Sequence, residues 1–173
     1  MQIKPTYIVG DFDSIKKEIL NRYKKVNKNI KQLIPEKDFT DTEAALEIAI
    51  KNKSKTVTII GAVGTRLDHT IANIHILKYA LENNIEVKII NENNEIKLID
   101  KYTELRKDKK YKYISIIPLT TEVTGLTLTG LKYELKNYNL KIGTSLGVSN
   151  EQVEDIATIN LEKGILILIK SRD

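Results

Sequence analysis

Short strand-like runs alternate with helix-length segments through the first half of this chain. The three pairs of runs are 6–10 with 14–26, 30–34 with 40–52, and 56–60 with 70–84, and a further strand-like run follows at 85–90. Strands joined through helices cannot pair as tight hairpins, so parallel pairing with right-handed crossovers is expected. The pattern predicts an α/β domain over residues 1–92, built on a Rossmann-like parallel sheet.

The helical period is lost from residue 93 onward. The runs beyond this point are short and rich in β-branched and aromatic residues, and Gly125, Gly130 and Gly143 punctuate them. This pattern is typical of a β-sandwich or a partly closed barrel. The last apolar runs, within 155–171, are predicted to form a hairpin that turns at 162–164. We therefore expect an all-β second domain, a β-sandwich, over residues 93–173.

The residue types exclude several classes of protein. The 173 residues include no cysteine and only two histidines, which excludes thiolate catalysis and histidine-rich metal sites. No apolar run of about 18 residues occurs and no secretory signal opens the chain, so a soluble, cytoplasmic protein without membrane contact is expected. The net charge of +5 is spread along the sequence, which favours a solvated lysine-rich surface over a nucleic-acid groove.

Glycine-containing loops follow two of the predicted strands. GDFDS (10–14) comes directly after the first strand, and GAVGTRLDH (61–69) comes after the third. Gly61 and Gly64 are expected to let the backbone turn sharply there. In open α/β sheets, ligands bind outside the carboxyl ends of the strands, where the first turns of helices offer unpaired N–H groups. Both loops are therefore candidate phosphate sites.

Acidic residues are expected to converge at this edge of the sheet, together with one arginine. They are Asp11, Asp13, Asp38, Asp41 and Asp68, with Arg66 two residues before the last of them. Any one of these aspartates is explained as a helix cap, and Thr40 with Glu43 has the spacing of a capping box. Crowded carboxylates repel one another, however, and a bound divalent cation offsets that cost. Magnesium with a polyphosphate, gripped by an arginine fork, fits the whole set.

Several motifs of other nucleotide-binding and hydrolytic proteins are absent. The chain has no GxxxxGK[ST] loop, no GxGxxG after a strand and no GxSxG elbow. A P-loop kinase, a Rossmann dehydrogenase and an α/β-hydrolase are therefore poorly supported.

Five motifs, in order, resemble those of the thiamine pyrophosphokinase (thiamin diphosphokinase) family. The nucleotide half contributes GDFDS, KDFTD (37–41) and GAVGTRLDH, and the second half contributes VTGLTLTGLKYEL (123–135) and TSLGVSNE (144–151). The resemblance implies a transferase of thiamine diphosphate biosynthesis, in which the α/β half binds Mg-ATP and the β-sandwich binds thiamine. It also implies a homodimer with the active site near the subunit interface, and transfer of a pyrophosphoryl group to the thiamine hydroxyl with release of AMP.

The resemblance also implies roles for individual residues. Asp11, Asp13 and Asp41 would hold magnesium, and Asp41, Asp68 and Arg66 would be the catalytic residues, Asp68 acting on the attacking hydroxyl and Arg66 on phosphate charge. The candidates for nucleotide binding are Asp13, Ser14, Thr40, Gly64 and Arg66. The candidates for thiamine binding are Ser149 and Asn150, with Thr144, Ser145 and Glu151 beside them.

The chain departs from the family pattern in two places, which leaves alternatives open. Family members usually begin with another βα unit carrying an Asp-Gly-Gly segment, and this chain starts just before GDFDS without it. Some members stack thiamine on a tryptophan, and since this chain has none, Tyr138 is the candidate here. The alternatives are a pyrophosphokinase for another small alcohol, such as a pterin, and a non-catalytic thiamine-binding module that lacks its first nucleotide-binding unit.

Overall fold

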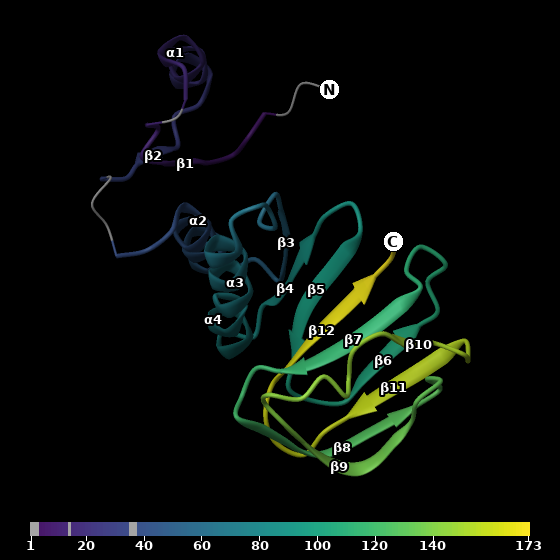
Figure 1. Cartoon of the computed structure of the whole chain (residues 1–173). Helices are drawn as coiled ribbons and strands as arrows, with labels where there is room; N and C mark the ends of the chain where they lie inside the picture. The colour runs from purple at the N-terminus through teal and green to yellow at the C-terminus, as the bar shows by residue number, and fades with distance from the viewer. Residues whose placement is uncertain (1–3, 14, 35–37) are drawn as a thin grey trace. The chain divides into compact units, whose positions relative to one another are not determined.

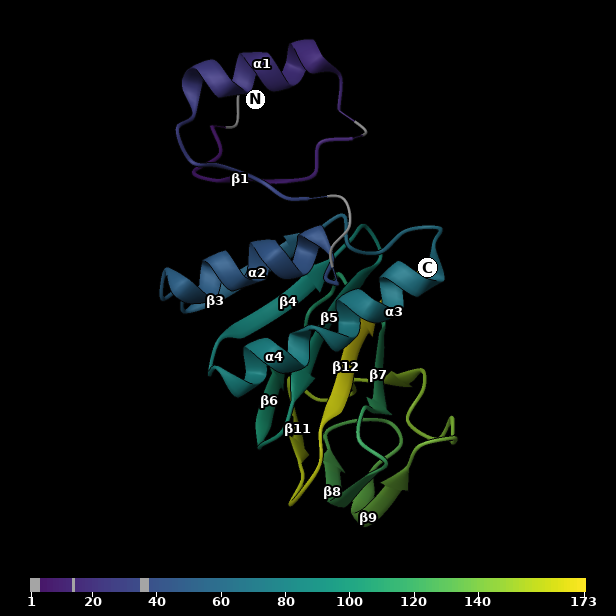
Figure 2. The same cartoon turned by 90° about the vertical axis from the view of Figure 1, so that its left-hand side faces the viewer.

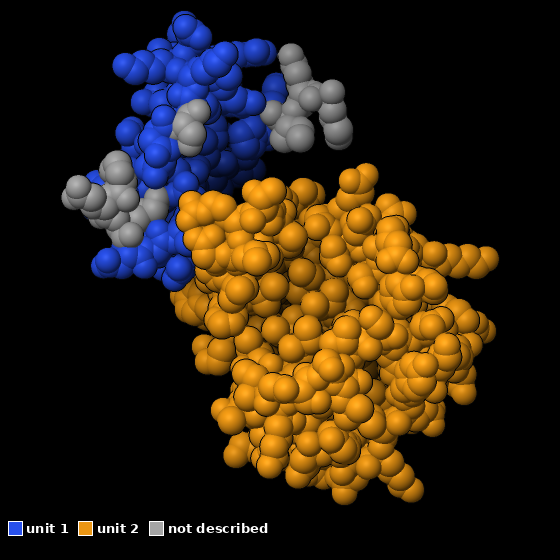
Figure 3. Space-filling view, viewed as in Figure 1, with its two compact units in different colours: residues 1–53 blue, residues 54–173 orange. Residues whose placement is uncertain are grey.

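The chain folds into two compact units. The structure, a computed structural model shown in Figure 1, describes residues 4–13, 15–34 and 38–173. The units are Met1–Lys53 and Ser54–Asp173, coloured separately in Figure 3. The domain division at residues 92 and 93 stays a prediction.

The smaller unit contains two parallel strands and two helices. Its elements are β1 (Ile8–Gly10), α1 (Lys17–Val26), β2 (Ile30–Gln32) and α2 (Asp41–Lys51). β1 and β2 pair in parallel, as the strand–helix alternation predicts. At the start of α2, the backbone N–H of Glu43 donates to Thr40 Oγ1 at 3.2 Å, which confirms the helix start at Thr40.

The larger unit begins with the third predicted strand and helix and then becomes entirely β. Its elements are β3 (Thr56–Ile60), α3 (Leu67–His75), α4 (Leu77–Glu82), β4 (Glu86–Ile90), β5 (Asn94–Ile99), β6 (Thr103–Arg106), β7 (Tyr113–Pro118), β8 (Glu122–Thr129), β9 (Leu135–Lys141), β10 (Asn150–Glu151), β11 (Ile156–Asn160) and β12 (Leu166–Ser171). They form a six-stranded sheet of order β10-β7-β12-β5-β4-β3 and a four-stranded sheet of order β6-β11-β8-β9. β3 and β4 are parallel and every other pair is antiparallel, so one sheet joins the α/β pattern to the β pattern.

The third predicted helix is divided in two. α3 ends and α4 begins around Ile76, where the N–H of Tyr79 donates to the Ile76 carbonyl at 3.1 Å in a tighter, three-residue turn. α4 packs against β4 and β5, and Figure 2 shows both helices from their outer side. No helix in the described part of the chain is long and apolar enough to cross a membrane.

The larger unit has a β-sandwich core, as predicted. The four-stranded sheet contributes Leu126, Leu140 and Ile159, and the six-stranded sheet contributes Ile116 and Leu168, all with 3% exposure or less. The apolar residues of both sheets therefore face a common interior.

The predicted C-terminal hairpin is wrong, because β11 and β12 belong to different sheets. Ala157 and Ile159 cover the core from one side, whereas Leu166 and Leu168 cover it from the other. The connecting segment crosses the end of the sandwich at Gly164, whose φ is +110° and where an added Cβ would lie 2.9 Å from the Val123 Cα. Two alternating strands that cover one core from opposite sides have the same sequence pattern as a hairpin.

Candidate functional site

The first acidic loop leaves β1 at Gly10. The backbone N–H of Asp13 donates to Asp11 Oδ1 at 3.3 Å, so these two aspartates share one turn. A Cβ added at Gly10 would lie 3.5 Å from Asp41 Oδ2, which places the carboxylate at the start of α2 against the end of β1. The smaller unit therefore brings Asp41 close to the loop that carries Asp11 and Asp13.

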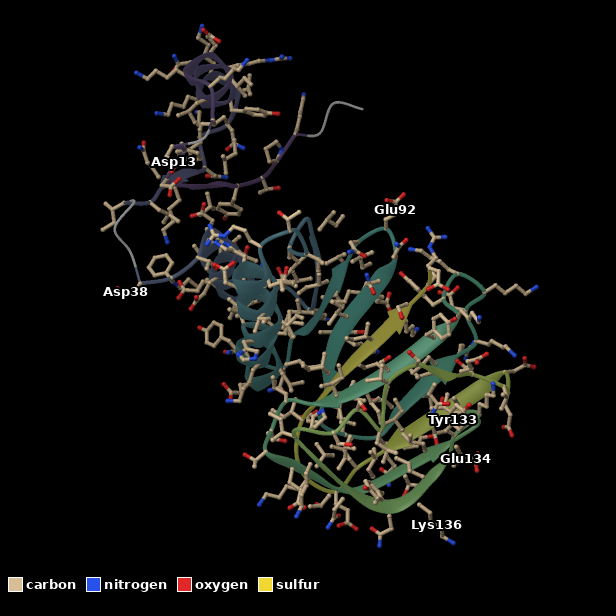
Figure 4. All side chains as sticks on the ribbon, in the orientation of Figure 1. Asp13, Asp38, Glu92, Tyr133, Glu134 and Lys136 are labelled. Carbon is tan, nitrogen blue, oxygen red and sulfur yellow. The ribbon has the colours of Figure 1, made fainter. Side chains whose placement is uncertain are left out.

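This arrangement is not a preformed metal cluster. Among the described residues, no group of three or more His, Cys, Asp and Glu side chains could by itself hold a metal ion. Asp38, labelled with Asp13 in Figure 4, lies in the segment before α2. Ser14, predicted to bind nucleotide, lies outside the described residues.

The loop after β3 differs from the prediction at one of its two glycines. Gly61 has a φ of +82°, a conformation that glycine adopts readily, whereas Gly64 is not among the glycines with positive φ. An added Cβ at Gly64 would meet no described protein atom within 4 Å. The Gly64 N–H is fixed by Thr70 Oγ1 at 3.3 Å. The missing side chain at Gly64 therefore leaves open space beside a fixed backbone.

Arg66 and Asp68 form a two-point ion pair at the start of α3. Arg66 Nη2 lies 2.5 Å from Asp68 Oδ2, and Arg66 Nε lies 3.3 Å from Asp68 Oδ1. Arg66 is the N-cap residue of α3 and Asp68 lies in its first turn, so Asp68 is not the cap itself. The hydrogen bond from Arg66 is the main cause that lowers the pKa of Asp68, and a backbone N–H from His69 adds to it. The same contact raises the pKa of Arg66.

The lowered pKa predicts how Asp68 titrates. Arg66→Gln should move the Asp68 midpoint up, towards the ordinary value of about 3.9. Because the folded-state pKa is depressed, the stabilisation by this pair is present above the unfolded pKa and is lost as the pH falls through the folded pKa. Arg66→Gln should therefore not lose this stabilisation at low pH. An NMR titration of the Asp68 carboxyl carbon measures the change in its pKa.

The matched control is Lys51→Gln, which removes an exposed ion pair with Glu47 on α2. It should leave the Asp68 midpoint unchanged. Equal Asp68 midpoints in wild type and Arg66→Gln would show that the Arg66–Asp68 pair does not form in solution.

The predicted thiamine segment is anchored on β7. The backbone N–H of Ser149 donates to Ser115 Oγ at 2.9 Å, and Ser149 has a positive φ of 59°. An added Cβ at Gly147 would collide with the Ile116 carbonyl oxygen, so only glycine lets the segment lie this close. The Thr144 hydroxyl accepts the N–H of Leu146 at 3.2 Å in a local turn. Three of the candidates remain exposed, namely Thr144, Ser145 and Ser149.

Asn150 is buried and its amide holds the backbone. Its Nδ2 donates to the Tyr133 carbonyl at 2.8 Å, and its Oδ1 accepts the N–H of Tyr133 at 3.0 Å and that of Glu151 at 2.9 Å. These bonds tie the β8–β9 connection to β10. A contact between Asn150 and thiamine stays a prediction, whereas these hydrogen bonds show that Asn150 positions the backbone at Tyr133 and Glu151.

Sequence reasoning missed Tyr133 as an aromatic beside this segment. Tyr133 is 61% exposed and is labelled in Figure 4, and the Asn150 amide fixes its backbone. Lys132 next to it pairs with Glu151 at 3.2 Å. Tyr138, the sequence-based choice, lies on β9 in the four-stranded sheet, whereas β10 at the end of the thiamine segment belongs to the six-stranded sheet. Tyr133 stands inside the GLKYEL motif, and its contact with Asn150 is not apparent from the sequence.

Comparison with known proteins identifies the family. A profile described as "Thiamin pyrophosphokinase, catalytic domain" matches residues 1–89, and one described as "Thiamin pyrophosphokinase, vitamin B1 binding domain" matches residues 102–166. A thiamine pyrophosphokinase of Bacillus subtilis is 36% identical over 172 residues, which cover 99% of this chain and 80% of that protein. This chain belongs to the thiamine pyrophosphokinase family.

Solved structures of thiamine pyrophosphokinases share the fold. The crystal structure from Bacillus subtilis superposes with a TM-score of 0.90 at 35% identity, covering 99% of this chain and 80% of that one. The structure from Geobacillus thermodenitrificans gives 0.85 at 33% identity, with coverages of 98% and 78%. A more distant relative, thiamin pyrophosphokinase 1 of Caenorhabditis elegans, is 28% identical over 85% of this chain and 62% of its own length. The α/β and β-sandwich arrangement is thus that of the thiamine pyrophosphokinase family.

The predicted site is distributed over both units of this thiamine pyrophosphokinase-family chain. Asp11, Asp13 and Asp41 belong to Met1–Lys53, and Arg66 and Asp68 belong to Ser54–Asp173. Their convergence on one nucleotide stays a prediction.

Proposed function

We propose that this chain transfers a pyrophosphoryl group from Mg-ATP to the hydroxyl of thiamine in the cytoplasm, giving thiamine pyrophosphate and AMP. The observation that carries the proposal is that the catalytic and vitamin B1-binding profiles both match one chain, in that order. The relatives that match nearly all of this chain bear the corresponding name.

The proposed metal is magnesium, held by Asp11, Asp13 and Asp41. The donor set fits, because all three ligands are carboxylates and the Asp41 oxygen lies beside the strand end that carries the other two. Magnesium usually keeps several waters and binds phosphate oxygens in addition to its protein carboxylates, so a complete protein cage is not required. When bound, the ion would supply neutralising charge to the phosphate oxygens.

Arg66 and Asp68 are proposed to act as an exchangeable pair. A phosphate offers the guanidinium the same two-point geometry as the Asp68 carboxylate does, so an arriving nucleotide can take over Arg66. Asp68 is then released to accept a hydrogen bond from the thiamine hydroxyl. Because the hydrogen bond from Arg66 is the main cause of the lowered Asp68 pKa, losing Arg66 to phosphate makes the carboxylate a better base at the moment when it faces the hydroxyl.

A homodimer is proposed because the two halves of the site lie far apart in one chain. A row of paired residues crosses the six-stranded sheet from Ile60 on β3 to Asn150 on β10. Five strand spacings of about 4.8 Å separate these edges by roughly 24 Å. Loop 61–69 follows Ile60, and Ser149 precedes Asn150, so a molecule as short as thiamine cannot bridge them. A partner subunit that supplies the thiamine segment solves this geometry.

The function is tested by AMP release from Mg-ATP with a panel of alcohols. Thiamine should support release, whereas a pterin alcohol and buffer alone should not. Release with the pterin alcohol in preference to thiamine would replace the substrate. Thiamine binding in calorimetry without Mg-ATP binding would instead identify a non-catalytic module.

Tyr133 is proposed as the aromatic surface for the thiamine rings, in place of Tyr138. An aromatic pair contributes about 0.5–1.5 kcal/mol, so Tyr133→Ala should raise the KM for thiamine roughly threefold to tenfold with little change in kcat. Tyr138→Ala is the matched control on β9 and should change neither constant. A larger KM effect in the Tyr138 variant would reverse the assignment.

Gly64 is proposed to leave room for the nucleotide. Because an added Cβ meets no described protein atom within 4 Å, Gly64→Ala should change the unfolding free energy by less than about 0.5 kcal/mol. The methyl group would instead occupy the ligand's space and raise the KM for ATP by roughly tenfold. Gly61→Ala, at a φ of +82°, should lower the melting temperature instead. Unchanged ATP kinetics in the Gly64 variant would remove this loop from the nucleotide site.

A further inference from the structure

A basic cavity opens at one end of the β-sandwich. It has a volume of about 200 Å³ and lies where β6, β7, β10 and β12 meet the 107–112 loop. Its cationic side chains are those of Arg106, Lys107, Lys109, Lys112 and Lys170. Its carboxylates are those of Asp108 and Glu151. The cations outnumber the carboxylates, although the sequence alone presents the same lysines as scattered surface charge.

The cavity begins where the apolar core ends. Leu166 and Leu168 point from β12 into the core, and Lys170 is the next residue on the same face of that strand. The Lys170 side chain is only 17% exposed. Ile114, a core residue paired with Lys170, also lines the cavity. A cation is thus held at the inner wall, and the loop cations lie nearer to solvent.

The two carboxylates of the lining are already engaged elsewhere. Glu151 pairs with Lys132 at 3.2 Å, and Asp108 Oδ1 accepts the backbone N–H of Lys110 at 2.9 Å. In the described part of the chain, Arg106 and Lys109 have no carboxylate oxygen within ion-pair distance. Arg106 and Lys109 are therefore cationic donors without an ion-pair partner among the described residues, although Asp108 and Glu151 keep their charge in the lining. The pKa of Lys112 is raised mainly by a hydrogen bond with Tyr113, and Glu151 helps to raise it.

Two further cations of the cavity wall have partners of their own. Lys170 shares Glu95 with Lys88, at 3.6 and 3.5 Å. Lys107 Nζ donates to the Val153 carbonyl at 3.1 Å, which neutralises none of its charge. These contacts fix the positions of both lysines while leaving an excess of positive charge.

We propose that this cavity binds a diphosphate group. The Arg106 guanidinium offers a planar fork and the lysines offer point charges, which together suit the several oxygens of a diphosphate. The volume is below the 300–1,000 Å³ or so of typical small-molecule pockets, so a compact anion fits better than a nucleotide or a nucleic acid. The group is either inorganic diphosphate or the diphosphate end of an organic ester. Neither the bound ligand nor its affinity depends on the proposed turnover.

Calorimetric titration of the full chain with inorganic diphosphate, in EDTA and without ATP, tests the site. Wild type should bind, and Arg106→Gln/Lys109→Gln should weaken binding by at least tenfold, since each charge-assisted bond corresponds to about that factor. Both side chains are exposed, so the fold should survive. The matched control is Lys136→Gln/Lys163→Gln, two exposed lysines outside the cavity, which should change the affinity less than twofold.

A second readout locates the ligand independently of the variants. In ¹H–¹⁵N spectra, diphosphate should shift the backbone amides of 106–112 and of Gln152. Arg66→Gln should retain these shifts, which separates this cavity from the nucleotide loop. Thiamine pyrophosphate is the second probe and shows whether the site takes free diphosphate or a diphosphate ester. Equal shifts with both probes would indicate a site for esters. Shifts with inorganic diphosphate alone would indicate a site for the free anion.

Two outcomes would overturn the proposal. One is the absence of diphosphate binding by wild type up to millimolar concentration. The other is an equal loss of affinity in both double variants, which would indicate diffuse surface charge. Neither outcome affects AMP release, and failed AMP release would leave diphosphate binding intact.

Discussion

Asp41→Asn should reduce AMP release by about 10²- to 10³-fold, as expected when the ion proposed to neutralise transition-state charge loses a ligand. Asp41 Oδ2 lies against the end of β1, beside the loop of Asp11 and Asp13. The asparagine keeps the shape of the side chain but removes its negative charge, so the proposed magnesium would lose a ligand. Steady-state AMP release with saturating thiamine and ATP measures the effect.

The matched control for this prediction is Glu43→Gln, in the same first turn of α2. Its capping bond runs from its backbone N–H to Thr40, so the substitution leaves that contact in place. AMP release should remain within twofold of wild type. A loss in both variants would indicate general damage to the helix start, and no loss in Asp41→Asn would remove this aspartate from the chemistry.

Arg66→Lys should lower kcat by about 10²-fold although the positive charge is kept. A lysine ammonium is a point charge and does not reproduce the planar fork that Arg66 presents to Asp68 and, by proposal, to phosphate. Melting temperature should hardly change, because both partners of this ion pair are largely exposed.

Arg22→Lys, an exposed substitution of the same kind on α1, is the control and should leave kcat unaltered. If product release limits kcat in wild type, that kcat should fall in viscous buffer. The kcat of Arg66→Lys should then not depend on viscosity, because chemistry would be slower than product release. Full activity in Arg66→Lys would mean that charge alone suffices at this position, and the exchange between Asp68 and phosphate would then be abandoned.

The sequence predicted those features that depend on neighbouring residues. The Thr40–Glu43 spacing gave the start of α2, and the strand–helix alternation gave the parallel pairs β1–β2 and β3–β4. Capping and parallel pairing follow from local hydrogen bonding and from the length of the connection, so they can be predicted from short windows.

Other features depend on contacts between distant residues, and these were missed. β11 and β12 alternate like a hairpin, yet the shared core places them in opposite sheets. Tyr133 and Tyr138 are equivalent aromatics in sequence, and Tyr133 is distinguished by its contact with the buried Asn150 amide, 17 residues away. The Arg66–Asp68 ion pair was missed for a different reason. Its residues are close in sequence, but the contact depends on side-chain rotamers, which the loop sequence does not specify.

The order of the strands has a consequence for how this chain is made. β12 follows all its sheet neighbours in sequence, yet it lies between β5 and β7 in the middle of the six-stranded sheet. On the ribosome, β5 and β7 must therefore wait with unpaired edges until residues 166–171 have emerged. Nascent chains stalled before that point should need a chaperone to prevent association through these strand edges. The chaperone should dissociate when β12 closes the sheet.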